Sequence, residues 1–152
     1  DRGQEAAFKD VPSTLEPAEQ AGVKLVSKQE LFETSDAISV HLVLSDRSRG
    51  IVDAASIQSM KSTAFLVNTS RAGLIDQAAL KQALEQGKIG GAGLDVFDTE
   101  PLPAQDSWRH VPRTILTPHL GYATPENFSV FFHNVVAAIK AYREGNPIKV
   151  LT

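Results

Sequence analysis

The chain has 152 residues, of which 42% are hydrophobic, enough for one globular domain with an ordinary core. Its net charge is −3 and its basic residues are scattered, so nucleic acid and anionic membranes are not expected partners. Without cysteine, a signal-peptide pattern, a long apolar span or a motif like H-E-x-x-H, it is expected to be soluble, cytoplasmic and free of metal.

Short strands and helices alternate from the start of the chain. Residues 1–22 carry Gly, Pro, Glu and Lys with weak apolar spacing, which predicts a loop or weakly anchored segment. Ser27 and Glu30 form a capping-box pattern, in which each side chain satisfies a backbone donor near the other, and a short helix is expected there. Strands are predicted at residues 22–26 and 36–44.

The alternation continues with predicted helices at 53–60 and 76–87 and predicted strands at 63–68, 89–97 and 114–118. In the longer helix, one face carries Leu80, Ala83 and Leu84, and Gly87 stands where such a helix ends. The segment between the last two strands is rich in Pro and polar residues, so no regular element is expected, and its Trp108 is interpreted as a packing anchor.

The longest helical pattern covers residues 125–144. Thr124 is its predicted N-cap, Pro125 takes the first helical position, and Gly145 and Pro147 follow its end. Apolar residues recur with the helical period at 128, 131, 132, 135, 139 and 142.

Apolar strands separated by helices predict a doubly wound α/β fold, with a parallel sheet covered on both faces. Residues 1–22 are interpreted as a loop or the remnant of the first half of this domain, 23–124 as its C-terminal part, and 125–152 as a helix and tail that would return to a second domain. In such sheets ligands bind beyond the carboxyl ends of the strands, so polar residues at strand ends are the candidate site.

Three strands of the predicted sheet end in such residues. Arg71 offers a planar, charged fork that fits a carboxylate. His119 can give or take a proton near neutral pH, and a carboxylate such as Glu100 beside it would favour the imidazolium and orient the ring. Asp95 could accept a hydrogen bond from an amide.

Each of these residues also has an ordinary structural explanation. His119 can close a loop, Glu100 can be a surface charge and Arg71 a salt-bridge partner. Asp95 must be paired or lie at a ligand, because an unpaired buried carboxylate costs several kcal/mol. His41 is either a satisfied core histidine or a ligand contact, and both alternatives stay open.

Four segments together resemble the D-isomer-specific 2-hydroxyacid dehydrogenases of the phosphoglycerate dehydrogenase-like group. In chain order they are "HLVLSDRSRGIV", "LVNTSRAGLID", "AGLDVFDTEP" and "TPHLGYAT". Four motifs in order, with 29 positions from Arg71 to Glu100 and 19 from Glu100 to His119, are more specific than any one pattern. The resemblance runs from about residue 22 to the end of the chain.

The resemblance implies a Rossmann-like domain and reversible hydride transfer between a nicotinamide cofactor and a 2-hydroxy or 2-oxo acid. It implies that His119 is the acid/base, Glu100 its partner, Arg71 the substrate clamp and Asp95 a contact of the nicotinamide carboxamide. It also implies a homodimer for the full-length enzyme. The implied cofactor-binding residues are His41, Leu42, Thr69, Ser70, Arg71, Asp95, His119 and Gly121.

The chain departs from the family in one large respect, because it contains no G-x-G-x-x-G loop to hold the cofactor's pyrophosphate. It therefore resembles the C-terminal portion of such an enzyme, with a sheet edge and face that the first half would cover. We expect it to be poorly soluble, to dimerise through that surface, or to derive from a longer protein. Asp1 is a candidate for the ribose contact, and Arg2 beside it leaves NADP open as well as NAD.

Two alternatives to an active dehydrogenase remain. One is a non-catalytic nicotinamide-binding interaction module, similar to the C-terminal-binding-protein corepressors, against which the lack of a Pro- or Ser-rich tail speaks. The other is an inactive truncated remnant. The sequence does not distinguish which 2-hydroxy acid would be the substrate.

Overall fold

The structure is a computed structural model that describes residues 6–8, 20 and 22–150. The chain divides into two compact units, Asp1–Pro118 and His119–Thr152. The described strands all lie in the first unit, and the second is built around one long helix. Asp1 and Arg2, the candidate ribose contacts, lie outside the described residues.

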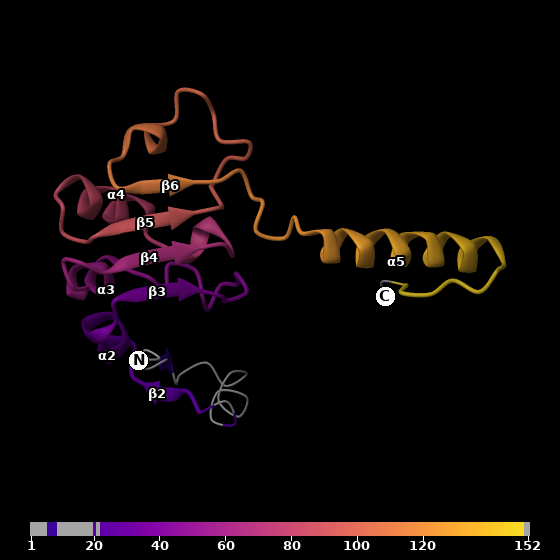
Figure 1. The fold of residues 1–152 in the computed structure, drawn as a ribbon, viewed down its shortest axis with the longest axis horizontal. Coiled ribbons are helices and arrows are strands. Elements are labelled where there is room, and N and C mark those ends of the chain that lie inside the picture. Colours follow the sequence, from indigo (N-terminus) through magenta and orange to yellow (C-terminus); the bar gives the residue numbers. More distant parts are fainter. Residues whose placement is uncertain (1–5, 9–19, 21, 151–152) are drawn as a thin grey trace. The chain divides into compact units, whose positions relative to one another are not determined.

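The first unit contains two parallel sheets (Figure 1). The larger has the order β3-β4-β5-β6, formed by Ala37–Val40, Phe65–Asn68, Gly91–Leu94 and Thr114–Leu116. The smaller pairs β1, Ala6–Phe8, with β2, Lys24–Val26. The parallel α/β architecture predicted from the alternating pattern is confirmed.

Two strand predictions need correction. The loop prediction for residues 1–22 is wrong at Ala6–Phe8, because these three residues pair in register with β2. So short a strand has no periodicity of its own and depends on pairing. The strand predicted at 36–44 ends at Val40, where its pairing with β4 ends opposite Asn68.

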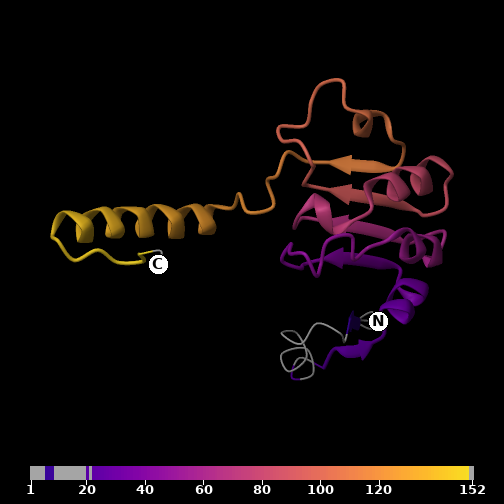
Figure 2. The same ribbon diagram turned by 180° about the vertical axis from the view of Figure 1, so that it is seen from behind.

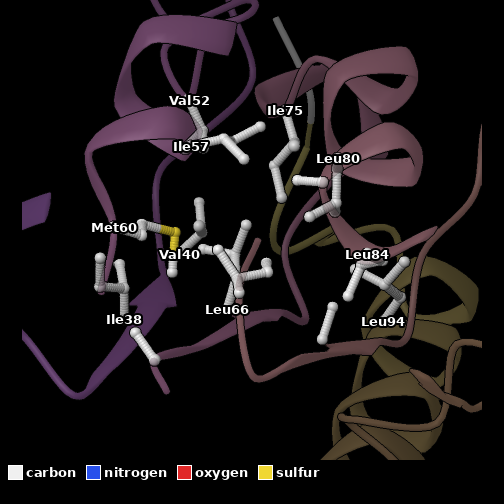
Figure 3. Close-up of a cluster of buried hydrophobic side chains, with 14 of the residues drawn as sticks. Ile38, Val40, Val52, Ile57, Met60, Leu66, Ile75, Leu80, Leu84 and Leu94 are labelled. Atoms are coloured by element: carbon white, nitrogen blue, oxygen red, sulfur yellow. The ribbon is translucent and has the colours of Figure 1, made fainter. Parts of the chain in front are cut away.

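One face of the larger sheet carries the hydrophobic core. Three helices bury their apolar residues in a single cluster with this face: α2 (Lys28–Thr34), α3 (Ala54–Ser59) and α4 (Gln77–Glu85). Figure 3 shows Ile57 of α3 and Leu80 and Leu84 of α4 gathered against the strand residues Leu66 and Leu94. The predicted helical face of Leu80, Ala83 and Leu84 is confirmed, since all three are fully buried.

Among the described residues of the first unit, no helix packs on the opposite face, which agrees with the expectation that one face of this sheet is left exposed. Side chains of residues paired in register point to the same side, which places Ser39, Val67, Gly93 and Ile115 in one row of this face. Ile115 is 73% exposed, and Phe65 on the same face is 53% exposed. The apolar strands are suited to two covered faces, but the helices described in the first unit cover only one.

The helices begin at the residues that the sequence predicts. Asp53, Asp76 and Thr124 each accept a hydrogen bond from the backbone N–H three residues on. Ser27 likewise accepts from the N–H of Glu30 at 3.1 Å, which is half of the predicted capping box. The other half is replaced by an ion pair, because a Glu30 oxygen lies 2.6 Å from the Lys24 Nζ atom.

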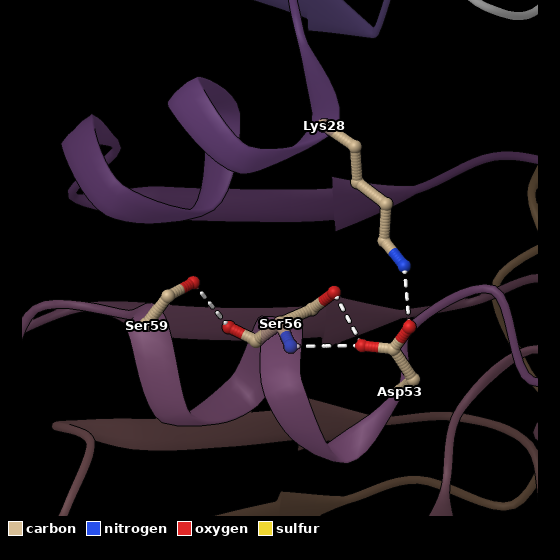
Figure 4. Close-up of polar contacts among 4 residues, drawn as sticks. All are labelled: Lys28, Asp53, Ser56 and Ser59. Carbon is tan, nitrogen blue, oxygen red and sulfur yellow. Dashed lines mark hydrogen bonds and ion pairs between the residues drawn. The ribbon is translucent and has the colours of Figure 1, made fainter.

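Asp53 links the starts of two helices (Figure 4). Its Oδ1 accepts from the Ser56 N–H at 2.8 Å and from the Ser56 hydroxyl at 2.7 Å, while its Oδ2 accepts from Lys28 Nζ of α2 at 2.8 Å. The hydrogen bonds from Lys28 and Ser56 lower the pKa of Asp53 from 3.8 to about 2. Its ionised form is therefore favoured by folding.

Two substitutions separate the cap from the charge at Asp53. Asp53→Ala removes both and is expected to lower the free energy of unfolding by about 1 kcal/mol at neutral pH. Asp53→Asn keeps an acceptor and loses only a half-exposed ion pair, so its cost is about 0.5 kcal/mol. Because folding lowers the pKa of Asp53, the difference in free energy of unfolding between the unsubstituted chain and Asp53→Asn is present above pH 3.8. It disappears as the pH falls through about 2. Urea unfolding across this range measures both, and a pH-independent Asn effect would contradict the assignment.

The second unit contains α5, Pro125–Arg143, with Thr124 as its cap and a positive φ of 77° at Gly145 after its end. The prediction of this helix is confirmed. Its six periodic apolar residues stay 42% to 75% exposed, and they are Phe128, Phe131, Phe132, Val135, Ile139 and Tyr142. No helix in the described part of the chain is long and apolar enough to cross a membrane.

Candidate functional site

A buried asparagine builds the turn that follows β4. Asn68 is fully buried, and its amide donates from Nδ2 to the Arg71 carbonyl at 2.9 Å and accepts at Oδ1 from the Ser70 N–H at 3.0 Å. The Ser70 hydroxyl donates to the Val40 carbonyl at the end of β3, at 2.8 Å. The turn is thus fixed to two neighbouring strands at their carboxyl ends.

Arg71 ends this turn, and its side chain is exposed. One guanidinium nitrogen, Nη1, donates to the Ser70 carbonyl at 2.6 Å. A guanidinium has five N–H groups, so the others can bind an anion in two parallel hydrogen bonds. The structure therefore places Arg71 at the carboxyl edge of the sheet, where the sequence predicts it.

Removal of the Asn68 amide tests how strongly the turn depends on it. Asn68→Ala leaves the Ser70 N–H and the Arg71 carbonyl without their partner, and we expect unfolding in urea to require about 2 kcal/mol less. Thr69→Ala is the matched control one residue on, where the side chain is exposed and the change should stay within about 0.5 kcal/mol. Equal effects at both positions would show that the amide does not hold the turn.

Asp95 follows β5 at the same edge and is only 3% exposed. Its N–H donates to the Asn68 carbonyl at 3.0 Å, which continues the ladder from β4. Its Oδ1 accepts from the Thr117 hydroxyl at 2.5 Å, so the prediction that this carboxylate must be paired is confirmed. Thr117 is not among the residues predicted from the sequence; the register that aligns Leu94 with Leu116 also brings the next residues of the two strands together.

Glu100 lies in the loop after β5. Its Oε1 accepts from the Phe97 N–H at 2.9 Å, its side chain is exposed, and its bond to Pro101 is cis. The same loop contains a short 3₁₀ helix, η3 (Ser107–His110), where no regular element was predicted. The cap that starts it is Asp106, which accepts from the Trp108 N–H at 2.8 Å.

The loop that carries Glu100 is anchored to α4. Trp108 is 4% exposed and belongs to the core, as predicted for a packing anchor. Lys81 of α4 lies 4.7 Å from the centre of the indole and donates to the Ser107 hydroxyl at 2.6 Å. Arg109 donates to the carbonyls of Leu102 and Pro103, at 2.7 and 2.8 Å. The loop is therefore held by packing as well as by hydrogen bonds.

His119 is the first residue of the second unit and is described within it. Its φ is 57°, a left-handed conformation that costs an L-residue about 1–2 kcal/mol, and one that Arg113 and Lys149 also adopt. Its ring meets Tyr122 edge-on, with 6.1 Å between the ring centres. Thr117, the partner of Asp95, lies only two residues before it in the chain.

The remaining predicted cofactor contacts have varied environments. His41 is exposed just beyond β3, with its Nε2 2.8 Å from the Ser39 hydroxyl, so the alternative of a core histidine is wrong. Leu42 is half-buried and packs against the core. Thr69 is exposed at the turn after β4, and Gly121 belongs to the second unit.

These residues suit the nicotinamide end of a dinucleotide better than its pyrophosphate. The carboxyl edge offers a buried carboxylate, hydroxyl groups and a guanidinium, which suit an amide and a carboxylate. Within the described residues, no glycine-rich turn joins a strand to a helix as a pyrophosphate cradle requires. Nor does the described part contain a cluster of three or more metal-ligating side chains.

A parallel α/β sheet with polar side chains at its carboxyl edge is the architecture of nucleotide-binding domains. Residues 5–121 match the family described as D-isomer specific 2-hydroxyacid dehydrogenase, NAD binding domain. The chain belongs to this family, and the resemblance inferred from the four motifs is confirmed.

Relatives of known name match over most of this chain. A glyoxylate reductase of Korarchaeum cryptofilum is 38% identical over 83% of the chain, and a glycerate dehydrogenase of Methylorubrum extorquens is 36% identical over 84%. A solved structure of a provisionally named D-3-phosphoglycerate dehydrogenase from Ralstonia solanacearum aligns with a TM-score of 0.86 and 38% identity over 92%. The chain spans only 38% to 41% of these three proteins.

Proposed function

We propose that the chain is part of an NAD-linked oxidoreductase that interconverts a 2-hydroxy acid and a 2-oxo acid. The observation that carries the proposal is the set of polar residues at the ends of β4 and β5, in a chain of this family. The named relatives, a glyoxylate reductase and a glycerate dehydrogenase, support the substrate class. The identity of the acid is left to experiment.

Four residues would divide the work. The guanidinium of Arg71 would bind the substrate's carboxylate, and the His119 imidazole would hold the proton that moves to or from the oxygen on the substrate's second carbon. Glu100 would orient that imidazole. Asp95, fixed by Thr117, would accept a hydrogen bond from the carboxamide of the cofactor.

The cofactor, when bound, supplies the site that gives or receives hydride. The turn that Asn68 fixes would present Thr69 and Ser70 beside it, and His41, Leu42 and Gly121 would complete its contacts. NAD is the proposed form, and the ribose contacts that would distinguish it from NADP fall outside the described residues.

The proposal extends to the whole protein. Residues 125–152 would belong with a substrate domain, because the apolar residues of α5 are exposed and need a cover. A homodimer is proposed from the family resemblance. A cytoplasmic location is proposed because this sequence, without cysteine, has no disulfide framework of the kind found in small secreted proteins.

A chimera tests the function directly. The present chain would be fused behind the part of the Korarchaeum cryptofilum glyoxylate reductase that precedes the matched region. Loss of NADH absorbance would then be followed with glyoxylate, pyruvate and other 2-oxo acids. Turnover that disappears in Arg71→Ala is the expected result, while a folded chimera that binds NADH and reduces none of these acids would contradict the proposal.

A further inference from the structure

Asp95 and Thr117 lie side by side where two neighbouring strands end. Both views of the ribbon show β5 and β6 adjacent, with their carboxyl ends on the same side (Figures 1 and 2). The Asp95 N–H donates to the Asn68 carbonyl and the Thr117 N–H to the Leu94 carbonyl, both at 3.0 Å. Each residue thus extends the parallel ladder by one position, so the backbone fixes where the two side chains begin.

The direction of the hydrogen bond between these side chains follows from their chemistry. An ionised carboxylate can only accept, so the Thr117 hydroxyl donates its single proton to Asp95 Oδ1, at 2.5 Å. A hydroxyl oxygen whose proton is engaged in this way can only accept from any further partner. A threonine hydroxyl can usually donate or accept, but Asp95 makes that of Thr117 an acceptor.

Thr117 is the accessible member of the pair. Asp95 is only 3% exposed, whereas Thr117 is an exposed residue. Among the hydrogen bonds of the described residues, none donates to the Thr117 hydroxyl oxygen. Both residues belong to the first unit, so their arrangement does not depend on the second. A ligand at this edge of the sheet therefore finds more of Thr117 than of Asp95 to contact.

A subsite that offers acceptors selects a group that offers donors. The carboxamide of a nicotinamide carries two N–H donors, as the side-chain amides of asparagine and glutamine do. A carboxylate in its place carries none and would be repelled by the charge of Asp95. A methyl ketone has neither donor nor charge, so it would leave the Thr117 oxygen without a partner.

We propose that Thr117 is a specificity residue, whose hydroxyl oxygen accepts an N–H of the cofactor's carboxamide beside Asp95. Asp95 holds the hydroxyl proton and thereby keeps the Thr117 oxygen an acceptor. The pair recognises the amide group itself and discriminates against its acid and ketone counterparts. The inference rests on the proposed function, because it takes the ligand at this edge to be a nicotinamide dinucleotide.

Three dinucleotides that differ in one group test this preference. They are NAD⁺, 3-acetylpyridine adenine dinucleotide, in which a methyl ketone replaces the amide, and nicotinic acid adenine dinucleotide, in which a carboxylate replaces it. Each is titrated into the isotopically labelled 152-residue chain, and the amide shifts of Asp95 and Thr117 are followed by NMR. We expect the ketone to bind about fivefold more weakly than NAD⁺, and the carboxylate at least about tenfold more weakly.

Two variants at position 117 make the test specific. Thr117→Val keeps the shape of the side chain and removes its oxygen, so the preference for NAD⁺ over the ketone should fall below about twofold. Thr117→Ser keeps the hydroxyl and should keep the preference. Thr114→Val is the matched control on β6, because the Thr114 hydroxyl donates to the Val111 carbonyl at 2.9 Å, and it should leave the preference unchanged. A merely structural role of Thr117 would weaken all three dinucleotides alike.

Several results would overturn the inference. These are equal affinities for NAD⁺ and the ketone, an unchanged preference in a folded Thr117→Val variant, and no shift at Asp95 or Thr117 with about 10 mM of any dinucleotide. The unsubstituted chain tests the order of affinities even if Thr117→Val does not fold. No 2-oxo acid enters these titrations, so a chimera that reduces no acid, beside a chain that keeps this order, would contradict the proposed function alone.

Discussion

Replacement of His119 by asparagine is expected to lower kcat/KM of the chimeric enzyme by about 10²–10⁴-fold, the usual loss when a general acid or base is removed. Asparagine can adopt the left-handed backbone conformation that the structure records at this position, with φ of 57°, so the turn should be preserved. The loss should fall mainly on kcat, because in the proposed mechanism His119 acts on the moving proton while Arg71 binds the acid. Steady-state kinetics of NADH oxidation separate the two parameters.

His110→Asn is the matched control for this experiment. His110 is exposed in η3, and nothing in the proposed chemistry involves it. Its substitution should change kcat/KM less than about twofold, since exposed positions outside a site seldom affect function. An active His119→Asn enzyme, or equal losses at both histidines, would remove His119 from the mechanism.

Leu66→Ala is expected to lower the free energy of unfolding of this chain by about 3 kcal/mol, enough to unfold a marginally stable domain. Leu66 is fully buried in β4, and its side chain lies in the core between the sheet and the helices α3 and α4. Truncation leaves a cavity that the packed neighbours can fill only partly. Urea unfolding followed by Trp108 fluorescence measures the loss, because the chain has one tryptophan.

The same truncation on the open face has a different expected result. Ile115 of β6 is 73% exposed, so Ile115→Ala should change the free energy of unfolding by less than about 0.5 kcal/mol. The two substitutions remove side chains of similar size from one sheet. Comparable losses would mean that the face bearing Ile115 is covered in solution.

Much of the architecture follows from local patterns in the sequence. The N-caps Asp53, Asp76 and Thr124 and the buried face of α4 were predictable because capping and the helical period depend on neighbouring residues. The strand β1 was not predictable, since its three residues are stabilised by pairing with β2, across 15 intervening residues. The apolar strands indicate two faces that can be covered, and nothing in their pattern says which residues cover them.

Some features of the candidate site were likewise predictable from the sequence, and others were not. Arg71 and Asp95 could be placed at one edge because strand ends in a parallel sheet meet there, and Glu100 could be placed only in the loop that follows β5. The bond from Thr117 to Asp95 depends on register, which a continuous apolar run does not specify. His41 was ambiguous because the apolar run continues to Leu44, although the strand ends at Val40.

The central claim, that the carboxyl edge of this sheet binds the nicotinamide end of the cofactor, is tested most directly by NADH titration of the isotopically labelled chain. Amide shifts followed by NMR should move at Thr69, Ser70 and Asp95, with affinity of about 1 mM, as expected when only one end of a ligand is held. Asp95→Ala should abolish these shifts. Shifts that gather on α3 and α4, or none at about 10 mM NADH, would contradict the claim.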